Sequence, residues 1–139
     1  MKYKKIEENK FLIRLDHGED LMESLLEFAK KEELSGGAMW GLGSVQEVTL
    51  AHYDLKKKEY VESEFEQAFE IVSLSGFLGM LEGKPVLHLH GTFSDEHMRT
   101  FAGHISDAKI AATCEIFFVK TSEIRRYKDS EVGLHLFDL

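Results

Sequence analysis

The hydrophobic pattern in the first third of the chain predicts a strand followed by a helix. A short apolar run over residues 11–15 indicates the strand. Apolar residues then recur at steps of three and four, as in an amphipathic helix. They are Leu21, Leu25, Phe28 and Ala29. We expect this helix to begin after Asp16, which can cap it, and to run for about four turns to about Leu34, before Ser35–Gly37 ends it.

Strand patterns separated by turns dominate the rest of the chain. Residues 38–45 are rich in small side chains, which suits a buried strand or a turn where backbones approach closely. Residues 69–78 alternate apolar and polar positions, which predicts a half-buried strand. Further strands are expected at residues 47–53, 60–65, 86–92 and 110–119, with a weaker signal at 134–137. One helix among many strands predicts an α+β fold with a mixed, largely antiparallel sheet.

The charge balance disfavours nucleic acid as a partner. The chain of 139 residues has 17 Lys and Arg against 25 Asp and Glu, a net charge of −8. Affinity for DNA comes largely from Lys and Arg that neutralise phosphates, so an acidic chain starts with a penalty. The two short basic stretches, Lys56–Lys58 and Arg125–Lys128, are interpreted as solvated loops or edges in preference to a phosphate-binding patch.

Cysteine usage and hydropathy predict a cytoplasmic protein with no membrane partner. The one cysteine, Cys114, excludes an intrachain disulfide and lies in an apolar run, where a buried inert thiol is expected. The charged N-terminus leads into no apolar stretch of signal-peptide length. No window approaches the roughly 20 apolar residues of a membrane span.

Three histidines form the candidate site. His88 and His90 flank one leucine within the predicted strand 86–92. Alternate residues of a strand point to the same side, so both imidazoles share one face. His104 follows further along, after Gly103, whose backbone can turn tightly or pack closely. Three imidazoles with an open fourth position suit a divalent metal, zinc above all, in a catalytic or ligand-binding site. Such spacing also occurs in surface or hydrogen-bonded histidines, so the spacing leaves both interpretations open.

Two carboxylates and one arginine are weaker candidates. Glu115 lies inside an apolar strand, where an unpaired carboxylate is costly. It could orient a ligand histidine, act as a catalytic acid or base on metal-bound water, or pair with an arginine. An exposed strand face is the equally acceptable alternative for Glu115, and Glu70 has the same ambiguity. Arg99 could meet an anionic ligand, although a solvated loop arginine is the preferred interpretation.

An ordered set of motifs resembles the PPC domain (DUF296) family, the domain shared by plants and prokaryotes. The matching segments include Gly41–Val45, Phe69–Gly76, Gly83–His90, Gly103–His104 and Thr113–Glu115. The resemblance covers about residues 9–120, which leaves a tail over 121–139 in a single domain of residues 1–139. Two departures are Ala102 before Gly103, where the family usually has a glycine, and Gln67–Ala68 before Phe69.

The resemblance implies a PPC-like α+β domain that assembles as a homotrimer. It also implies that His88, His90 and His104 occupy the positions where prokaryotic relatives can hold zinc. The arrangement is similar to that of acetolactate decarboxylases, whose fold is related and whose metal is catalytic. Plant members bind DNA through a separate AT-hook built on Arg-Gly-Arg-Pro, and this chain has no such motif. A DNA-binding function for this chain would therefore rest only on the name of the family and not on the motif that binds DNA in the plant members.

Three functions are weighed from the sequence. The preferred one is a regulatory module, a trimer that holds metal and recognises a small ligand or a protein partner. The alternative is a zinc-dependent lyase or hydrolase that acts on a small carboxylate or ester, with Glu115 as its acid or base. Direct DNA binding is the third and is disfavoured by net charge. One fold can host unrelated functions, so kinship alone does not choose among them.

Overall fold

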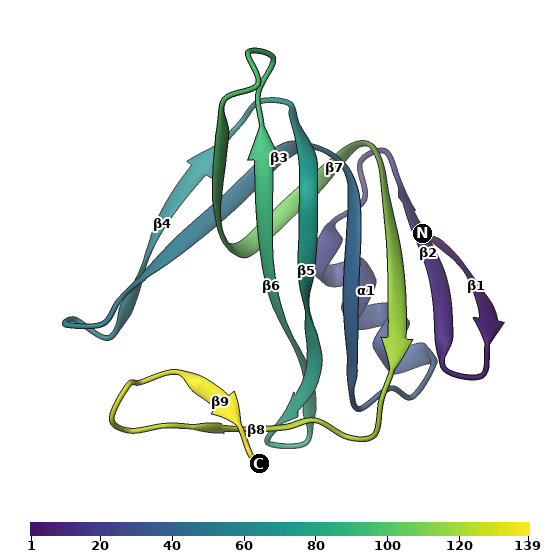
Figure 1. Cartoon of the computed structure of the whole chain (residues 1–139), viewed down its shortest axis with the longest axis vertical. Coiled ribbons are helices and arrows are strands. Elements are labelled where there is room, and N and C mark those ends of the chain that lie inside the picture. Colours follow the sequence, from purple (N-terminus) through teal and green to yellow (C-terminus); the bar gives the residue numbers. More distant parts are fainter.

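A single sheet with one helix forms the fold, which is α+β as predicted. The computed structural model describes residues 1–139. Its elements are β1 (Lys2–Glu7), β2 (Lys10–Asp16), α1 (Leu21–Lys31), β3 (Gly37–Asp54), β4 (Glu59–Phe65), β5 (Phe69–Leu81), β6 (Lys84–Ser94), β7 (Thr100–Lys120), β8 (Arg125–Lys128) and β9 (His135–Phe137) (Figure 1). No helix is both long and apolar enough to cross a membrane.

The sheet is mixed and largely antiparallel. Its main path runs β1-β2-β7-β3-β5-β8-β9, while β4 pairs with β3, and β6 pairs with both β5 and β7. Every pairing is antiparallel except that of β5 with β8. The long strands β3 and β7 lie side by side at the centre, and each carries register shifts along their pairing.

The helix is shorter than the pattern predicted, and its cap is different. Asp20, not Asp16, is the N-cap, and its side chain accepts a hydrogen bond from the backbone N–H of Glu23. Asp16 instead ends β2, where it pairs in register with Thr113. The helix ends at Lys31 because the chain then turns through Glu33, which has a positive φ of 51°.

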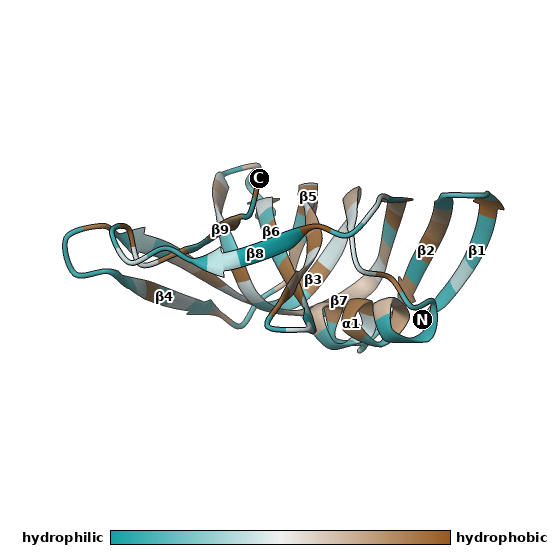
Figure 2. Cartoon of the chain, turned by 90° about the horizontal axis from the view of Figure 1, so that it is seen from below, coloured by the Kyte–Doolittle hydropathy of each residue, from teal (hydrophilic) through white to brown (hydrophobic).

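One face of the sheet is closed by the helix, and the other is open. Leu21, Leu25, Phe28 and Ala29 of α1 are buried against the sheet, as the helical periodicity predicted. An aromatic cluster fills this core, with Phe28 in edge-to-face contact with Phe11 and Phe118. On the opposite side of the sheet from α1 lie β9 and the C-terminus (Figure 2).

The sequence pattern predicted most of the strands but divided or shortened the two longest ones, β3 and β7. Residues 38–45 and 47–53 belong to one strand, β3, and β7 begins at Thr100, well before the predicted strand at residue 110. The predicted polar loop of residues 94–100 is correspondingly shorter. β1 and β8 were not predicted, because both are rich in charged residues and both lie where one face of the strand meets solvent.

The C-terminal hairpin, β8 and β9, crosses the open face and joins two distant parts of the chain. Arg125 and Arg126 of β8 pair with the end of β5. The loop before β9 contacts the tip of the β3–β4 hairpin, where the Tyr53 hydroxyl donates a hydrogen bond of 2.8 Å to the Val132 carbonyl. The hairpin thereby lies beside the strands that carry the candidate histidines (Figure 1).

Candidate metal centre

The three histidines come from two neighbouring strands. His88 and His90 alternate with buried Leu89 on β6, so the leucine enters the core and the imidazoles point to the open face. His104 lies on β7, directly opposite His90 in the β6–β7 pairing. The pairing of the two strands therefore brings together residues that are separated in the sequence.

The ring nitrogens are close enough for one ion to reach all three. One nitrogen from each ring lies within 4.8 Å of the others. The Nε2 atoms of His88 and His90 are 3.2 Å apart. Two nitrogens bound to one tetrahedral zinc, at roughly 2.0–2.1 Å from the ion, are about 3.3 Å apart. The observed separations therefore fit a zinc ion after small rotations of the rings.

The surroundings favour the neutral imidazoles that a metal requires. The pKa of His88 is lowered to about 4, mainly by burial and also by the positive charges of Arg126 and the other two histidines. Burial is also the main cause that lowers the pKa of His104, while Glu62 acts against it. Both rings are neutral at pH 7, so their lone pairs are available without proton release.

The position of His104 supplies an independent test of fit. Its Nδ1 is buried and has no hydrogen-bond partner within the chain. Buried side-chain nitrogens without a partner are uncommon in native proteins. The Tyr60 ring is stacked on His104, with ring centroids 4.9 Å apart, and holds the imidazole in place. A metal ion bound by the three histidines would give the buried His104 nitrogen the partner that the chain does not provide.

The lowered pKa of His88 predicts a pH-dependent stability in the absence of metal. Well above pH 6.5 the His88 ring is neutral in both the folded and the unfolded chain, so it does not lower the free energy of unfolding there. As the pH falls from 6.5 towards 4, the unfolded chain takes up the proton first, so the free energy of unfolding decreases. Urea unfolding with a chelator present, repeated across this range, measures the decrease.

A substitution isolates the contribution of His88 from those of the carboxylates. His88→Gln is expected to flatten the profile between pH 6.5 and 4, with the residual slope due in part to His104. The same change at the exposed His97 is the matched control and should leave the profile as it is. Parallel profiles for wild type and His88→Gln would contradict the expectation.

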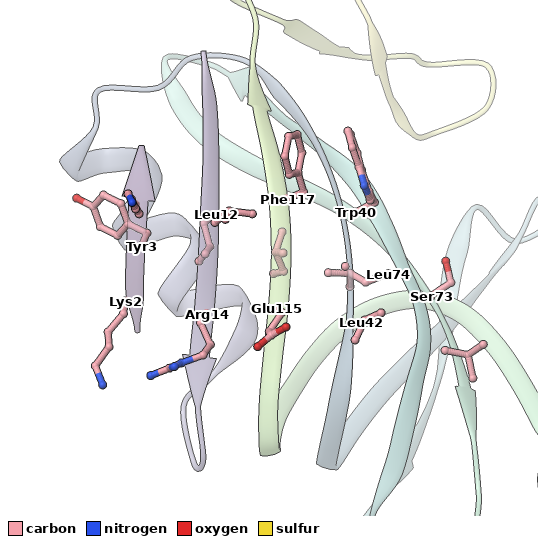
Figure 3. A pocket seen from close by; sticks show the side chains of 15 residues that line it. Lys2, Tyr3, Leu12, Arg14, Trp40, Leu42, Ser73, Leu74, Glu115 and Phe117 are labelled. Carbon is pink, nitrogen blue, oxygen red and sulfur yellow. The ribbon is translucent and has the colours of Figure 1, made fainter. Parts of the chain in front are cut away.

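Glu115 lies elsewhere on the open face. It is exposed on β7 and faces Arg14 of β2 and Leu42 of β3 in register. Figure 3 shows it at a cavity of about 670 Å³ that Trp40 and Phe117 also line. None of the three histidines lines this cavity. An acid or base role for Glu115 at the histidines therefore finds no support in the geometry of one chain, and it stays a prediction.

The other polar candidates are also outside the cluster. Glu70 is exposed on β5, opposite Ser44 of β3. Arg99 forms an ion pair of 2.6 Å with Asp95 in the turn between β6 and β7, as expected for a loop arginine. Cys114 is fully buried, and burial raises the pKa of its thiol to about 12, which suits an inert side chain.

Three side chains beside the histidines were not predicted from the sequence. They are Tyr60 of β4, Phe77 of β5 and Arg126 of β8. Tyr60 is stacked on His104, Phe77 faces His88 in register, and the charge of Arg126 acts on His88. No motif signals them, because each comes from a different strand and approaches the site only through the folding of the sheet and the C-terminal hairpin.

One family model matches most of the chain. Residues 3–122 match the family model of the Plants and Prokaryotes Conserved (PCC) domain. Among curated proteins, none matches the sequence.

Three solved structures are similar over almost the whole chain. A candidate DNA-binding protein from Bacteroides thetaiotaomicron is 28% identical, with a TM-score of 0.94 over 99% of this chain and 96% of that one. A metal-containing protein from Archaeoglobus fulgidus is 31% identical, with a TM-score of 0.86 over 96% and 99%. A plant- and prokaryote-conserved protein from Pyrococcus horikoshii is 28% identical, with a TM-score of 0.86 over 94% and 91%.

A more distant similarity extends to an enzyme. Acetolactate decarboxylase from Bacillus subtilis is 18% identical, with a TM-score of 0.55 over 82% of this chain and 53% of that chain. This comparison shows a shared fold and nothing about activity.

Proposed function

This chain belongs to the Plants and Prokaryotes Conserved (PCC) domain family, and on that premise we propose that it is a metal-binding regulatory module that recognises a small ligand or a protein partner as a homotrimer. The observation that carries the proposal is the convergence of one nitrogen each from His88, His90 and His104 within 4.8 Å. The similar protein from Archaeoglobus fulgidus is a metal-containing protein, which supports a metal in this chain as well.

Each histidine has a defined part in holding the ion. His88 and His90 would present their Nε2 atoms from one strand, and His104 would close the set from the paired strand. Tyr60 keeps the His104 ring from rotating away. We propose zinc, because imidazole nitrogen suits it and the separations match its bond lengths. Three neutral ligands leave the ion its full charge and an open position, where it would supply Lewis acidity to a bound oxygen.

Exposed apolar side chains on the open face of the sheet support the proposal that the chain self-associates as a trimer. Large apolar side chains are exposed there, with Trp40 at 52% and Leu42 at 60%. Exposed apolar patches of this kind mark interaction sites on soluble proteins. Self-association would cover them without affecting the helix-covered core.

A zinc-dependent lyase or hydrolase acting on a small carboxylate or ester is the second candidate. The observation that favours it is the open coordination position, since catalytic zinc sites use three protein ligands and keep the fourth for water or substrate. Glu62 is the carboxylate whose charge reaches His104, and it accepts a hydrogen bond of 2.6 Å from Ser106. Turnover of a small acid or ester that His88→Ala abolishes would favour this candidate over a binding module.

Metal content is the direct test of the proposal. We expect elemental analysis of the purified protein to give one divalent metal, zinc, per protomer, and light scattering to give the mass of a trimer. A protein that neither retains zinc nor binds it when it is added back would refute the proposal. A metal-loaded monomer would refute the trimer alone.

DNA binding has its own expected result. Two similar structures are candidate DNA-binding proteins, but the net charge here is −8. We expect the purified protein to leave duplex DNA unshifted in a gel, even at low salt, because its excess of Asp and Glu over Lys and Arg repels the phosphates. A shift that weakens steeply as salt increases would contradict this expectation.

A further inference from the structure

The C-terminal hairpin contributes to a cavity beside the histidines. The hairpin consists of β8 and β9, residues 125–137, and lies beyond residues 3–122, which match the family model. The cavity has a volume of about 520 Å³, and its lining includes His88 and His90 of β6 together with Phe137 of β9. A segment outside the matched domain therefore takes part in the surroundings of the candidate metal centre.

Phe137 is held in the cavity wall by two contacts. The Arg126 guanidinium lies over its ring, 4.5 Å from the centroid, and Nη1 of the same arginine donates a hydrogen bond of 2.9 Å to the His135 carbonyl. Phe77 of β5 is edge-to-face with Phe137, with ring centroids 5.3 Å apart, and pairs in register with His88. Because β8 also pairs with the end of β5, the position of the Phe137 ring is fixed relative to the strands beside the histidines.

The lining of this cavity is mostly apolar, and it contains no charged side chain. Three of its side chains are aromatic, and its polar side chains are the two imidazoles and the hydroxyl of Ser75. Ser75 lies opposite His90 in register, so the polar groups of the lining are neighbours. Small-molecule sites are typically cavities of about 300–1,000 Å³ with an apolar wall and a few polar groups that fix orientation. This cavity has that volume and that composition, with its polar groups at the histidines.

The composition of the wall defines the chemistry of an occupant. Two of the three candidate metal ligands line the cavity, so it adjoins the position of the ion. A metal held by three protein ligands keeps an open position, which takes an oxygen of water or of a ligand. Aromatic rings attract one another in edge-to-face and offset-stacked arrangements, and Trp40, Phe77 and Phe137 offer such contacts. A charged group away from the metal would find no counter-charge in this lining.

We propose that this cavity binds the ring of a small aromatic ligand whose oxygen donor coordinates the metal, and that Phe137 is the residue that selects for the ring. The proposal rests on the metal centre proposed above and names the class of ligand for it. Removal of the Phe137 ring would take an aromatic neighbour from the ligand and open the cavity wall to water. A ligand that has the same oxygen donor but no ring would bind the metal alone and would not depend on Phe137.

The test compares benzohydroxamate with acetohydroxamate on the full chain loaded with zinc, since the two probes share a metal-binding group and differ in the ring. Trp40 is the one tryptophan of the chain and lines the cavity, so its fluorescence reports the binding of benzohydroxamate. Displacement of benzohydroxamate measures the affinity for acetohydroxamate. After correction for binding to free zinc, we expect benzohydroxamate to bind at least about tenfold more tightly. Metal-free protein should bind benzohydroxamate at least about tenfold more weakly than the zinc-loaded protein.

Phe137→Ala should lower the preference for benzohydroxamate over acetohydroxamate at least about fivefold, while the affinities for acetohydroxamate and zinc stay within about twofold of wild type. Leu136→Ala is the matched control, because Leu136 is the adjacent residue of β9, is 37% exposed against 36% for Phe137, and does not line the cavity. It should keep the preference of wild type. If Phe137→Ala fails to fold by circular dichroism, Phe137→Leu carries the test, because leucine keeps apolar bulk and loses the ring.

The outcomes separate this proposal from that of the metal centre. Failure of the wild type to bind zinc would refute the metal centre. Normal zinc binding with equal corrected affinities for the two hydroxamates, or with an unchanged preference in the Phe137 variant that folds, would overturn the aromatic site and leave the metal centre standing. Equal binding of benzohydroxamate with and without zinc would show that the ligand does not coordinate the metal, and would overturn the proposal as well.

Discussion

His90→Ala is expected to lower the affinity for zinc by at least about 100-fold, because even an outer-shell partner of a metal ligand costs 10- to 100-fold when removed. The Nε2 of His90 lies 3.2 Å from that of His88, and its strand partner is His104. Its removal would leave two imidazoles, too few to hold the ion against a chelator. A chromophoric chelator in competition at pH 7.5 measures the affinity, and elemental analysis measures the metal that survives purification.

The matched control for this substitution is a histidine that lies outside the strands that carry the cluster. His97 is exposed in the turn between β6 and β7 and is not part of the cluster. His97→Ala should retain zinc with unchanged affinity. Equal zinc content in His90→Ala and wild type would remove His90 from the site and leave the proposed metal centre without its main support.

Phe28→Ala is expected to lower the free energy of unfolding by about 3–5 kcal/mol, the usual cost of deleting a buried phenylalanine ring. Phe28 is 1% exposed and is the centre of the aromatic cluster. Its ring centroid lies 4.9 Å from Tyr3, 5.3 Å from Phe11 and 5.5 Å from Phe118. The vacated space is bounded by strands on one side and α1 on the other, which limits how far it can collapse.

Urea unfolding at neutral pH, with zinc present and then removed, measures this loss. Met98→Ala is the control, because Met98 is 79% exposed and its truncation should change the free energy of unfolding by less than about 0.5 kcal/mol. A loss below about 1 kcal/mol for Phe28→Ala would mean that the helix is not packed on the sheet as described.

The element types followed from the sequence, because each has a period that only one secondary structure satisfies. Leu21, Leu25 and Phe28 recur at helical steps and are all buried, while residues 69–78 alternate and form β5. The cap failed as a prediction because both Asp16 and Asp20 are good caps in isolation. Asp16 already pairs with Thr113 in the sheet, which leaves Asp20 to begin the helix.

Part of the candidate site was also predictable. The alternation within His88–His90 determined that these two imidazoles share a face, since the two-residue period of a strand allows nothing else. The proximity of His104 depends on the pairing of β6 with β7. The sequence proposed His104 as the third ligand and the family resemblance supported it, but neither gave this pairing.

The sequence by itself determined the α+β class, the helix-covered core and the shared face of His88 and His90, because these depend on local periods and on burial of apolar side chains. Only the tertiary structure decided that Glu115 lies away from the histidines and that Arg126 lies near them. The physical reason is that strand pairing and the path of the C-terminal hairpin depend on contacts between residues far apart in the chain, which no local pattern records.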